Sequence, residues 1–237
     1  MKEAAIHLGP IALPSADEIG QDGAGHSENE YLGKTKYDAK TALTYKDRPV
    51  AQQTAEMALL DRAFAFVPKD QRVLDLPCGG GRVSMHLARQ GYQMSCADYS
   101  DAMLQITRAS LAESGLDCPV ERQDIERLSY ADAQFDTIVC FRLFHHFPTP
   151  TIRQKAVAEL CRVAGSQVMI SYSSPYSPSS LARRLRLLFG GRKSQKFTTS
   201  LAEVEACFRT HGFRLVKDFA RSPLLHTLHL ALFERIQ

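Results

Sequence analysis

Short apolar runs alternate with amphipathic stretches along most of the chain. Five runs have the length and composition of strands, the third being weaker, and they are residues 72–76, 92–98, 118–124, 135–141 and 167–172. Amphipathic stretches with helical spacing separate several of them, and these are residues 80–91, 100–115 and 149–165. Each stretch ends at a glycine (Gly91, Gly115 or Gly165), as many helices do. This alternation predicts a parallel sheet covered by helices on both faces.

The part of the chain before the first strand divides in two. Residues 1–30 are rich in Gly, Ser, Asp and Glu and predict a flexible segment. Residues 31–68 predict one or two helices, in which Met57, Leu60 and Phe64 follow a helical spacing that continues to Val67. Pro68 is expected to stop the last of these helices.

The C-terminal part has a different pattern from the core. A basic, partly amphipathic segment covers 179–197, and a further helix is predicted over 200–212. Residues 213–220 and 224–236 read as two final strands, which predict an antiparallel hairpin at the edge of the sheet. No internal repeat and no second domain is predicted.

Composition and charge narrow the class of protein. Of the 237 residues, 44% are hydrophobic and 23% are charged, as in ordinary globular proteins. The formal net charge of +3 is small, so charge does not indicate a nucleic-acid-binding protein. The six cysteines form no CxxC pair or zinc-like cluster, so we expect neither a metal site nor a disulfide framework. No segment approaches the about 20 apolar residues that cross a bilayer, and no signal peptide is recognised. A soluble, cytoplasmic enzyme is the expectation.

The bend after the first strand is the strongest candidate for a binding site. Asp75 ends an apolar run, and a loop with Gly79 and Gly81 leads into the next helix. Glycines let the backbone turn tightly and approach a ligand closely, and parallel sheets bind ligands beyond the carboxyl ends of their strands. A glycine-rich bend is by itself a weak signal, because a tight connection needs the same residues.

Two further acids follow the next strands. Asp98 ends the second strand, where a carboxylate can accept hydrogen bonds from the ribose hydroxyls of an adenosine. Tyr99 and Met103 are expected to line an apolar slot for a purine. Asp124 follows the third strand and can accept from the purine amino group, and Ile125 adds an apolar face.

The acid at the mouth of the bend separates two candidate cofactors. A dinucleotide places its pyrophosphate on such a bend, and Asp75 would repel it. S-adenosylmethionine carries a positively charged sulfonium and ammonium, and a carboxylate at this position would attract them. The charge argument therefore favours the methyl donor over a nicotinamide dinucleotide.

The motifs together resemble a known family. VLDLPCGGGR is similar to the first motif of class I S-adenosylmethionine-dependent methyltransferases, and the likeness continues through CADYSDAML, RQDIERL, FDTIVC and LFHHF. It covers residues 70–175 and is close to the small-molecule group that includes the ubiquinone and menaquinone C-methylases. The resemblance implies a Rossmann-like fold with a seven-stranded, mostly parallel sheet and a C-terminal antiparallel hairpin. Residues 31–237 are then one domain, with an N-terminal helical lid at 31–68, a cofactor-binding core at 69–175, and a basic helical segment and the final strands at 176–237.

The resemblance also assigns roles in the cofactor site. Asp75 would orient the ammonium group through water, and Asp98 would hold the ribose. Asp124 and Ile125 would meet the adenine, and Phe141 and Arg142 would lie beside the sulfonium. The loop residues expected in the cofactor site are Pro77, Cys78, Gly79 and Gly81. Pro77 departs from the family pattern, which has glycine there, and it removes one backbone donor.

The expected chemistry is an in-line methyl transfer in which the protein aligns the nucleophile and removes a proton. His145 and His146 follow the fourth strand, where an acceptor should enter, and a neutral imidazole can act as the base near pH 7. The alternative is that these histidines only shape the pocket. The acceptor is predicted to be a small molecule or lipid-linked metabolite, methylated on oxygen or carbon. A non-catalytic cofactor-binding scaffold and a nicotinamide oxidoreductase are the alternative functions.

Two flanking features bear on the choice of acceptor. Tyr45 and Arg48 could contact the cofactor from the lid, or could belong to a surface helix. Residues 181–196 hold six basic residues and no acid, and can either touch an anionic membrane or form a solvated lid.

Overall fold

A computed structural model describes residues 49–189, 197–222 and 226–236 of the chain. The expected flexible segment 1–30, Tyr45, Arg48 and residues 190–196 of the basic segment lie outside the described residues. The descriptions below concern the described ranges alone.

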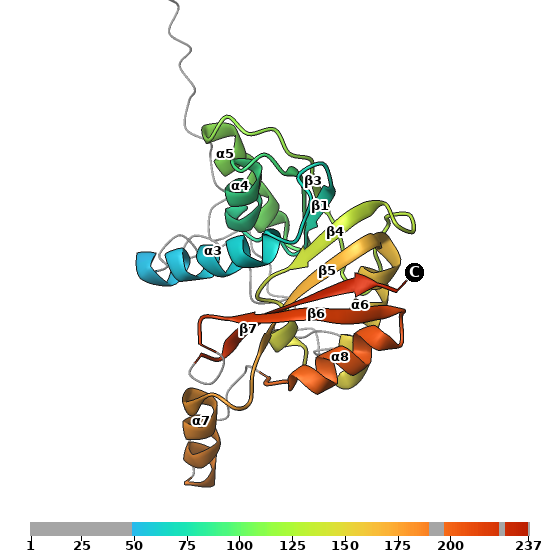
Figure 1. Ribbon diagram of the computed structural model, residues 1–237. Helices are drawn as coiled ribbons and strands as arrows, with labels where there is room; N and C mark the ends of the chain where they lie inside the picture. Colours follow the sequence, from blue (N-terminus) through green and yellow to red (C-terminus); the bar gives the residue numbers. More distant parts are fainter. Residues whose placement is uncertain (1–48, 190–196, 223–225, 237) are drawn as a thin grey trace, which may run out of the picture. The chain divides into compact units, whose positions relative to one another are not determined.

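The described chain is built on one seven-stranded sheet with the order β3-β2-β1-β4-β5-β7-β6 (Figure 1). The strands are β1 Arg72–Asp75, β2 Gln93–Asp98, β3 Val120–Arg122, β4 Phe135–Cys140, β5 Ala164–Ser173, β6 Phe213–Ala220 and β7 Leu228–Arg235. The first five run parallel, and β7 is antiparallel to both β5 and β6. The predicted mostly parallel sheet with a C-terminal antiparallel hairpin is therefore confirmed.

Helices cover both faces of the sheet. They are α3 Val50–Phe64, α4 Arg82–Ala88, α5 Asp101–Glu113, the short 3-10 helix η3 Phe144–His146, α6 Pro150–Val163, α7 Pro178–Leu188 and α8 Leu201–Arg209. In Figure 1, α3, α4 and α5 lie on one side of the sheet, and α6 and α8 lie on the other. The described residues form three apolar clusters, one under α3 and α4, one under α6 and α8, and a smaller one between α5 and the end of β2.

Side-chain caps fix where three helices begin. The Oγ of Ser100 accepts from the backbone N–H of Met103 at the start of α5, and Thr149 caps α6, with Pro150 as its first residue. Ser200 and Glu203 form a reciprocal capping box at the start of α8. Each cap satisfies backbone donors that a helix start leaves unpaired, which stabilises the helix by about 1 kcal/mol.

One helix end differs from its prediction. Gly165 was expected just after a helix, but α6 ends at Val163 and the chain enters β5 directly at Ala164. Ala164 pairs with Phe135 in the ladder, so Gly165 is a strand residue. A Cβ on Gly165 would come 3.3 Å from the Phe135 carbonyl oxygen, which explains the glycine by close packing of two strands.

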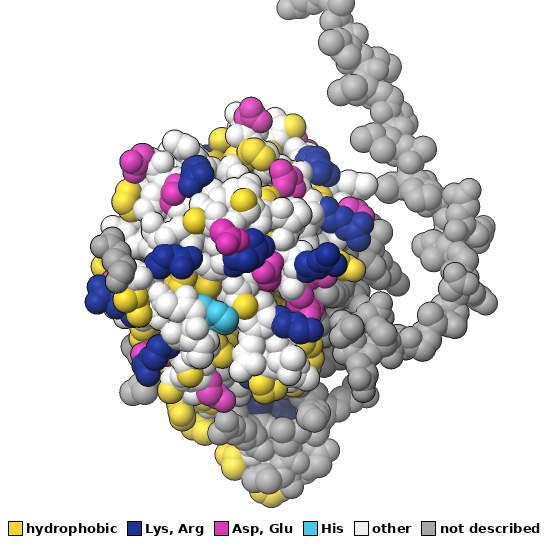
Figure 2. Space-filling model, turned by 90° about the vertical axis from the view of Figure 1, so that its right-hand side faces the viewer, with side chains coloured by type: hydrophobic (Ala, Val, Ile, Leu, Met, Phe, Trp, Pro, Cys, Tyr) yellow, Lys and Arg dark blue, Asp and Glu magenta, His cyan; other side chains and the backbone are white. Residues whose placement is uncertain are grey.

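Helix α7 leaves the layered core. It follows β5 and lies apart from the sheet in Figure 1. Leu181 and Leu185 of this helix and Phe189 just after it are 48%, 57% and 87% exposed, so an apolar stripe faces solvent. On the face drawn in Figure 2, by contrast, basic and acidic side chains of the described residues are interspersed.

Candidate cofactor and acceptor site

The glycine loop joins the end of β1 to the start of α4 and is fastened to β2. The backbone N–H of Cys78 donates to the Ala97 carbonyl at 2.8 Å, and the N–H of Gly79 donates to Asp98 Oδ2 at 2.8 Å. Gly79 and Gly81 have positive φ values of 54° and 78°, a region in which side chains with a Cβ are strained. The loop is thus held tightly against the carboxyl end of β2.

Gly81 is also constrained by its neighbour on α5. A Cβ at this position would lie 3.0 Å from Thr107 Cγ2, closer than ordinary van der Waals contact. The Thr107 hydroxyl donates to the Gly79 carbonyl, so α5 touches the loop at two places. The sequence signal of three consecutive glycines therefore has a packing reason besides ligand access.

Asp98 lies at the centre of this arrangement. Its carboxylate is 6% exposed and accepts from the backbone N–H groups of Gly79 and, at 2.9 Å, Ser100. Burial raises the pKa of Asp98, and the backbone hydrogen bonds oppose that shift. A carboxylate has about four acceptor positions. Asp98 can therefore anchor the loop and still accept from a ribose, and the latter role stays a prediction.

Asp75 lies beneath the loop. It is fully buried, and the Ser84 hydroxyl of α4 donates to its Oδ2 at 2.6 Å. Burial raises the pKa of Asp75 to about 7. Its Oδ1 has no hydrogen-bond partner among the described residues. Such a buried oxygen calls for a water or a ligand donor, which fits the predicted water-mediated contact with an ammonium group.

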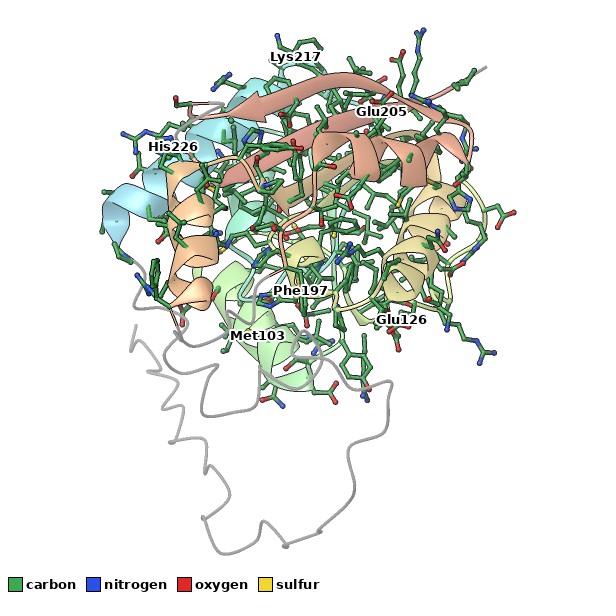
Figure 3. All side chains as sticks on the ribbon, turned by 90° about the horizontal axis from the view of Figure 1, so that it is seen from below. Met103, Glu126, Phe197, Glu205, Lys217 and His226 are labelled. Atoms are coloured by element: carbon green, nitrogen blue, oxygen red, sulfur yellow. The ribbon has the colours of Figure 1, made fainter. Side chains whose placement is uncertain are left out.

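The predicted adenine residues differ in exposure. Tyr99 is 39% exposed, and the Arg122 guanidinium lies 5.3 Å from its ring centre. Met103, labelled on α5 in Figure 3, is 1% exposed, so its side chain belongs to the core rather than to an open slot. Ile125 is also buried, and Asp124 Oδ1 accepts from the Glu126 N–H at 3.0 Å. The structure therefore leaves Tyr99 as the open apolar surface of this group.

The chain after β4 turns sharply beside the loop. Phe141 is buried, and Arg142 has a positive φ of 65°, unusual for a residue with a side chain. The Arg142 N–H donates to Ser171 Oγ of β5 at 2.5 Å, which holds this conformation. The turn directs the Arg142 guanidinium toward α3, where it donates to Glu56 Oε1 at 2.9 Å.

The two candidate basic groups occupy η3 after this turn. His145 and His146 are 3% and 4% exposed, with ring centres 4.2 Å apart. The Phe197 N–H donates to the His145 carbonyl at 2.9 Å, and the Thr199 N–H donates to the Ser173 carbonyl at 2.9 Å. Residues 197–199 therefore lie against both the η3 turn and the end of β5, with Phe197 labelled in Figure 3. A catalytic role for either histidine stays a prediction.

Sequence reasoning missed an ion cluster at the same edge. Glu56 of α3 is buried and contacts two guanidinium groups, Arg82 Nη2 at 2.8 Å and Arg142 Nη1 at 2.9 Å. This cluster joins α3, the start of α4 and the turn after β4. Glu56 lies four residues before Leu60, on the apolar face of a helix. An acid at such a position is the feature of the sequence from which the ion cluster could have been predicted.

A second polar group was also missed, on the hairpin. His229 Nδ1 of β7 lies 2.7 Å from Asp218 Oδ2 of β6, and the ring of Tyr172 of β5 lies beside the imidazole. Burial raises the pKa of Tyr172. No group of three or more His, Cys, Asp or Glu side chains among the described residues is arranged to hold a metal ion.

Comparisons with known proteins agree with this geometry. Residues 73–166 match the family model described as a methyltransferase domain. The chain is 30% identical over 156 residues to a ubiquinone biosynthesis O-methyltransferase of Xanthomonas axonopodis pv. citri (strain 306), covering 62% of this chain and 64% of that protein. A protein of the same name from Xylella fastidiosa (strain 9a5c) is 32% identical over 150 residues, 61% of each chain. The match thus spans somewhat less than two thirds of these relatives.

Solved structures show the same fold at low sequence identity. Magnesium protoporphyrin IX methyltransferase from Synechocystis PCC 6803 with bound SAH has a TM-score of 0.68 at 18% identity, covering 86% of this chain and 96% of that one. A protein from Pyrococcus horikoshii OT3 has a TM-score of 0.65 at 19% identity, covering 81% and 95%. The sheet order and these structures show that the chain has the Rossmann-like fold of class I methyltransferases, and its residues 73–166 are similar to a methyltransferase domain.

Proposed function

We propose that this protein transfers a methyl group from S-adenosylmethionine to an oxygen of a small-molecule acceptor. The observation that carries this is the loop between two buried carboxylates, with Asp75 beneath it and Asp98 fastened to Gly79. The Cys78 and Gly79 N–H groups already donate within the protein, and Pro77 has none to offer. A pyrophosphate would meet negative charge and few free donors, whereas a sulfonium and an ammonium suit the site.

The proposed mechanism divides the work among the residues at this edge. The cofactor, when bound, supplies an activated methyl group. Asp98 would accept from the ribose, and Asp75 would orient the ammonium group through water. Phe141 would exclude water beside the transferred carbon, and His145 or His146 would take the acceptor proton. The names of the curated relatives support oxygen over carbon as the methylated atom.

Calorimetric titration with S-adenosylhomocysteine, beside NAD as a control, tests the cofactor assignment. We expect micromolar binding of the first alone. Asp98→Asn should weaken this binding at least tenfold, because it removes a charge-assisted hydrogen bond. Asp101→Asn is the matched control, since Asp101 is exposed and pairs only with the exposed Arg122 in the described chain. Equal affinity of both variants with the wild type would remove Asp98 from the site.

An acceptor screen separates the remaining alternatives. The turnover of phenolic acceptors is measured with a labelled methyl donor for the wild type, His145→Gln and His146→Gln. A lower rate in one variant identifies the base. Wild-type rates in both variants would show that neither histidine is the base. Tight S-adenosylhomocysteine binding with no methylated acceptor would favour the non-catalytic scaffold. NAD binding would favour the oxidoreductase.

We further propose that α7 brings the protein to an anionic membrane, which would give access to lipid-linked acceptors. The apolar stripe of Leu181, Leu185 and Phe189 supports this, because Arg183 and Arg186 flank it and residues 177–202 contain no acid. None of the helices in the described ranges is long and apolar enough to span a membrane. Co-sedimentation with anionic but not neutral liposomes, lost in Leu185→Glu, is expected. Binding to neither leaves α7 as a solvated lid.

All six cysteines are free thiols in the structure. We therefore propose a cytoplasmic location, because thiols persist in a reducing compartment.

A further inference from the structure

A cavity of about 350 Å³ lies between α3 and the start of β7. Ala55, Leu59 and Leu228 form its apolar wall, and Glu56, Arg142, Arg221 and His226 supply its polar groups. Figure 3 shows His226 beside α3. The Ser174 N–H, just after β5, donates to the neighbouring Thr227 carbonyl at 2.8 Å, so the cavity opens at the carboxyl edge of the parallel strands. We call it the Arg221 pocket.

The described side chains that line the Arg221 pocket carry more positive than negative charge. Its one carboxylate, Glu56, is shared by Arg82 and Arg142. Arg221 adds a third guanidinium, which forms no ion pair or hydrogen bond within the described residues. Among the described residues that line the pocket, two guanidinium groups and one carboxylate are present, and Arg221 is the positive charge without an ion pair. A pocket of this kind attracts an anion.

A ring nitrogen of His226 is a second indication that the pocket binds a ligand. The Nδ1 of His226 is buried and has no hydrogen-bond partner among the described residues. Buried ring nitrogens in proteins normally have a partner, so its absence indicates a water or a ligand atom at this position. Arg221 and His226 thus offer two donors to the same occupant, provided the His226 tautomer carries its proton on Nδ1.

We propose that the Arg221 pocket binds a carboxylate on the methyl acceptor, so that the acceptor is a small acid with an apolar body. This rests on the proposed function and names its substrate class. A singly charged carboxylate fits better than a phosphate, because the Glu56 carboxylate on the same wall repels a dianion more strongly. The volume is near the lower end of small-molecule sites, which suits a single ring.

The position of the pocket favours the acceptor over the cofactor. The carboxylates expected to hold the cofactor end β1 and β2, whereas the pocket lies between α3 and the segment from the end of β6 to the start of β7. Arg142 connects the two regions, because it lines the pocket and follows Phe141, the residue expected beside the transferred methyl group. An acceptor held at Arg221 would therefore extend toward the reaction centre.

The test measures binding directly and does not need turnover. Protein saturated with S-adenosylhomocysteine is titrated with 3,4-dihydroxybenzoate and with its uncharged amide. We expect the acid to bind at least tenfold more tightly than the amide, and Arg221→Gln to abolish this preference. Arg214→Gln is the matched control, because Arg214 is an exposed arginine near the other end of β6, paired with Glu234. It should keep the preference.

Three results would overturn the assignment. They are equal or undetectable binding of the acid and the amide to the wild type, an unchanged preference in Arg221→Gln, and a parallel loss of S-adenosylhomocysteine affinity in that variant. The last result would place the cofactor's own carboxylate in the pocket. If the acid binds as expected but is never methylated, the pocket assignment stands and the proposed O-methylation fails.

Discussion

The ion cluster at Glu56 gives the sharpest test of how α3 is attached to the core. Glu56→Gln keeps the size of the side chain and one acceptor oxygen, but removes the charge that Arg82 and Arg142 share. The three side chains are 5%, 12% and 22% exposed, so water screens the two cations only in part. Removing one partner of a buried ion pair costs about 3 to 5 kcal/mol. We take about 3 kcal/mol here, because the glutamine oxygen can still accept one hydrogen bond.

Urea unfolding followed by far-UV circular dichroism measures this loss. With an m-value of about 2 to 3 kcal/mol per molar, the midpoint should fall by about 1 M. The control is Glu205→Gln on α8, whose partner Arg209 is 70% exposed and whose own side chain is 32% exposed. Exposed pairs of this kind contribute less than about 1 kcal/mol. Equal midpoint shifts for both variants would refute the reasoning, because burial would then not decide the strength of the pair.

Two further predictions concern the glycine loop. Gly81→Ala should destabilise the protein more than Gly91→Ala. Both positions have positive φ, but only a Cβ at Gly81 meets a neighbour, Thr107 Cγ2 at 3.0 Å. The midpoints of urea unfolding measure both losses of stability, and equal losses would contradict the packing argument. Asp75 has a folded pKa of about 7, above its ordinary 3.8, so the folded state holds a proton that the unfolded state has lost between these values. Stability should therefore fall as the pH rises from about 4 to 7, by up to about 4 kcal/mol, and Asp75→Asn should flatten this dependence. An unchanged pH profile in that variant would show that Asp75 does not titrate in this range.

Local features of the sequence were enough for the strands, the helices and the glycine loop. The Ser100 cap is an example, because a hydroxyl beside a helix start acts on backbone groups three residues away. Gly165 shows the limit of the same rules. Its place in β5 depends on the approach of Phe135 from a neighbouring strand, which no local pattern contains.

The sequence by itself determined the order of elements, the sheet class and the motif with Asp75 and Asp98, because these depend on periodicity and on residues close along the chain. Only the tertiary structure decided what those groups contact. Glu56 and Arg142 are 86 positions apart, and Arg221 and His226 reach α3 from the other end of the chain. A buried charge is identified by the partners that surround it, and packing alone brings such partners together.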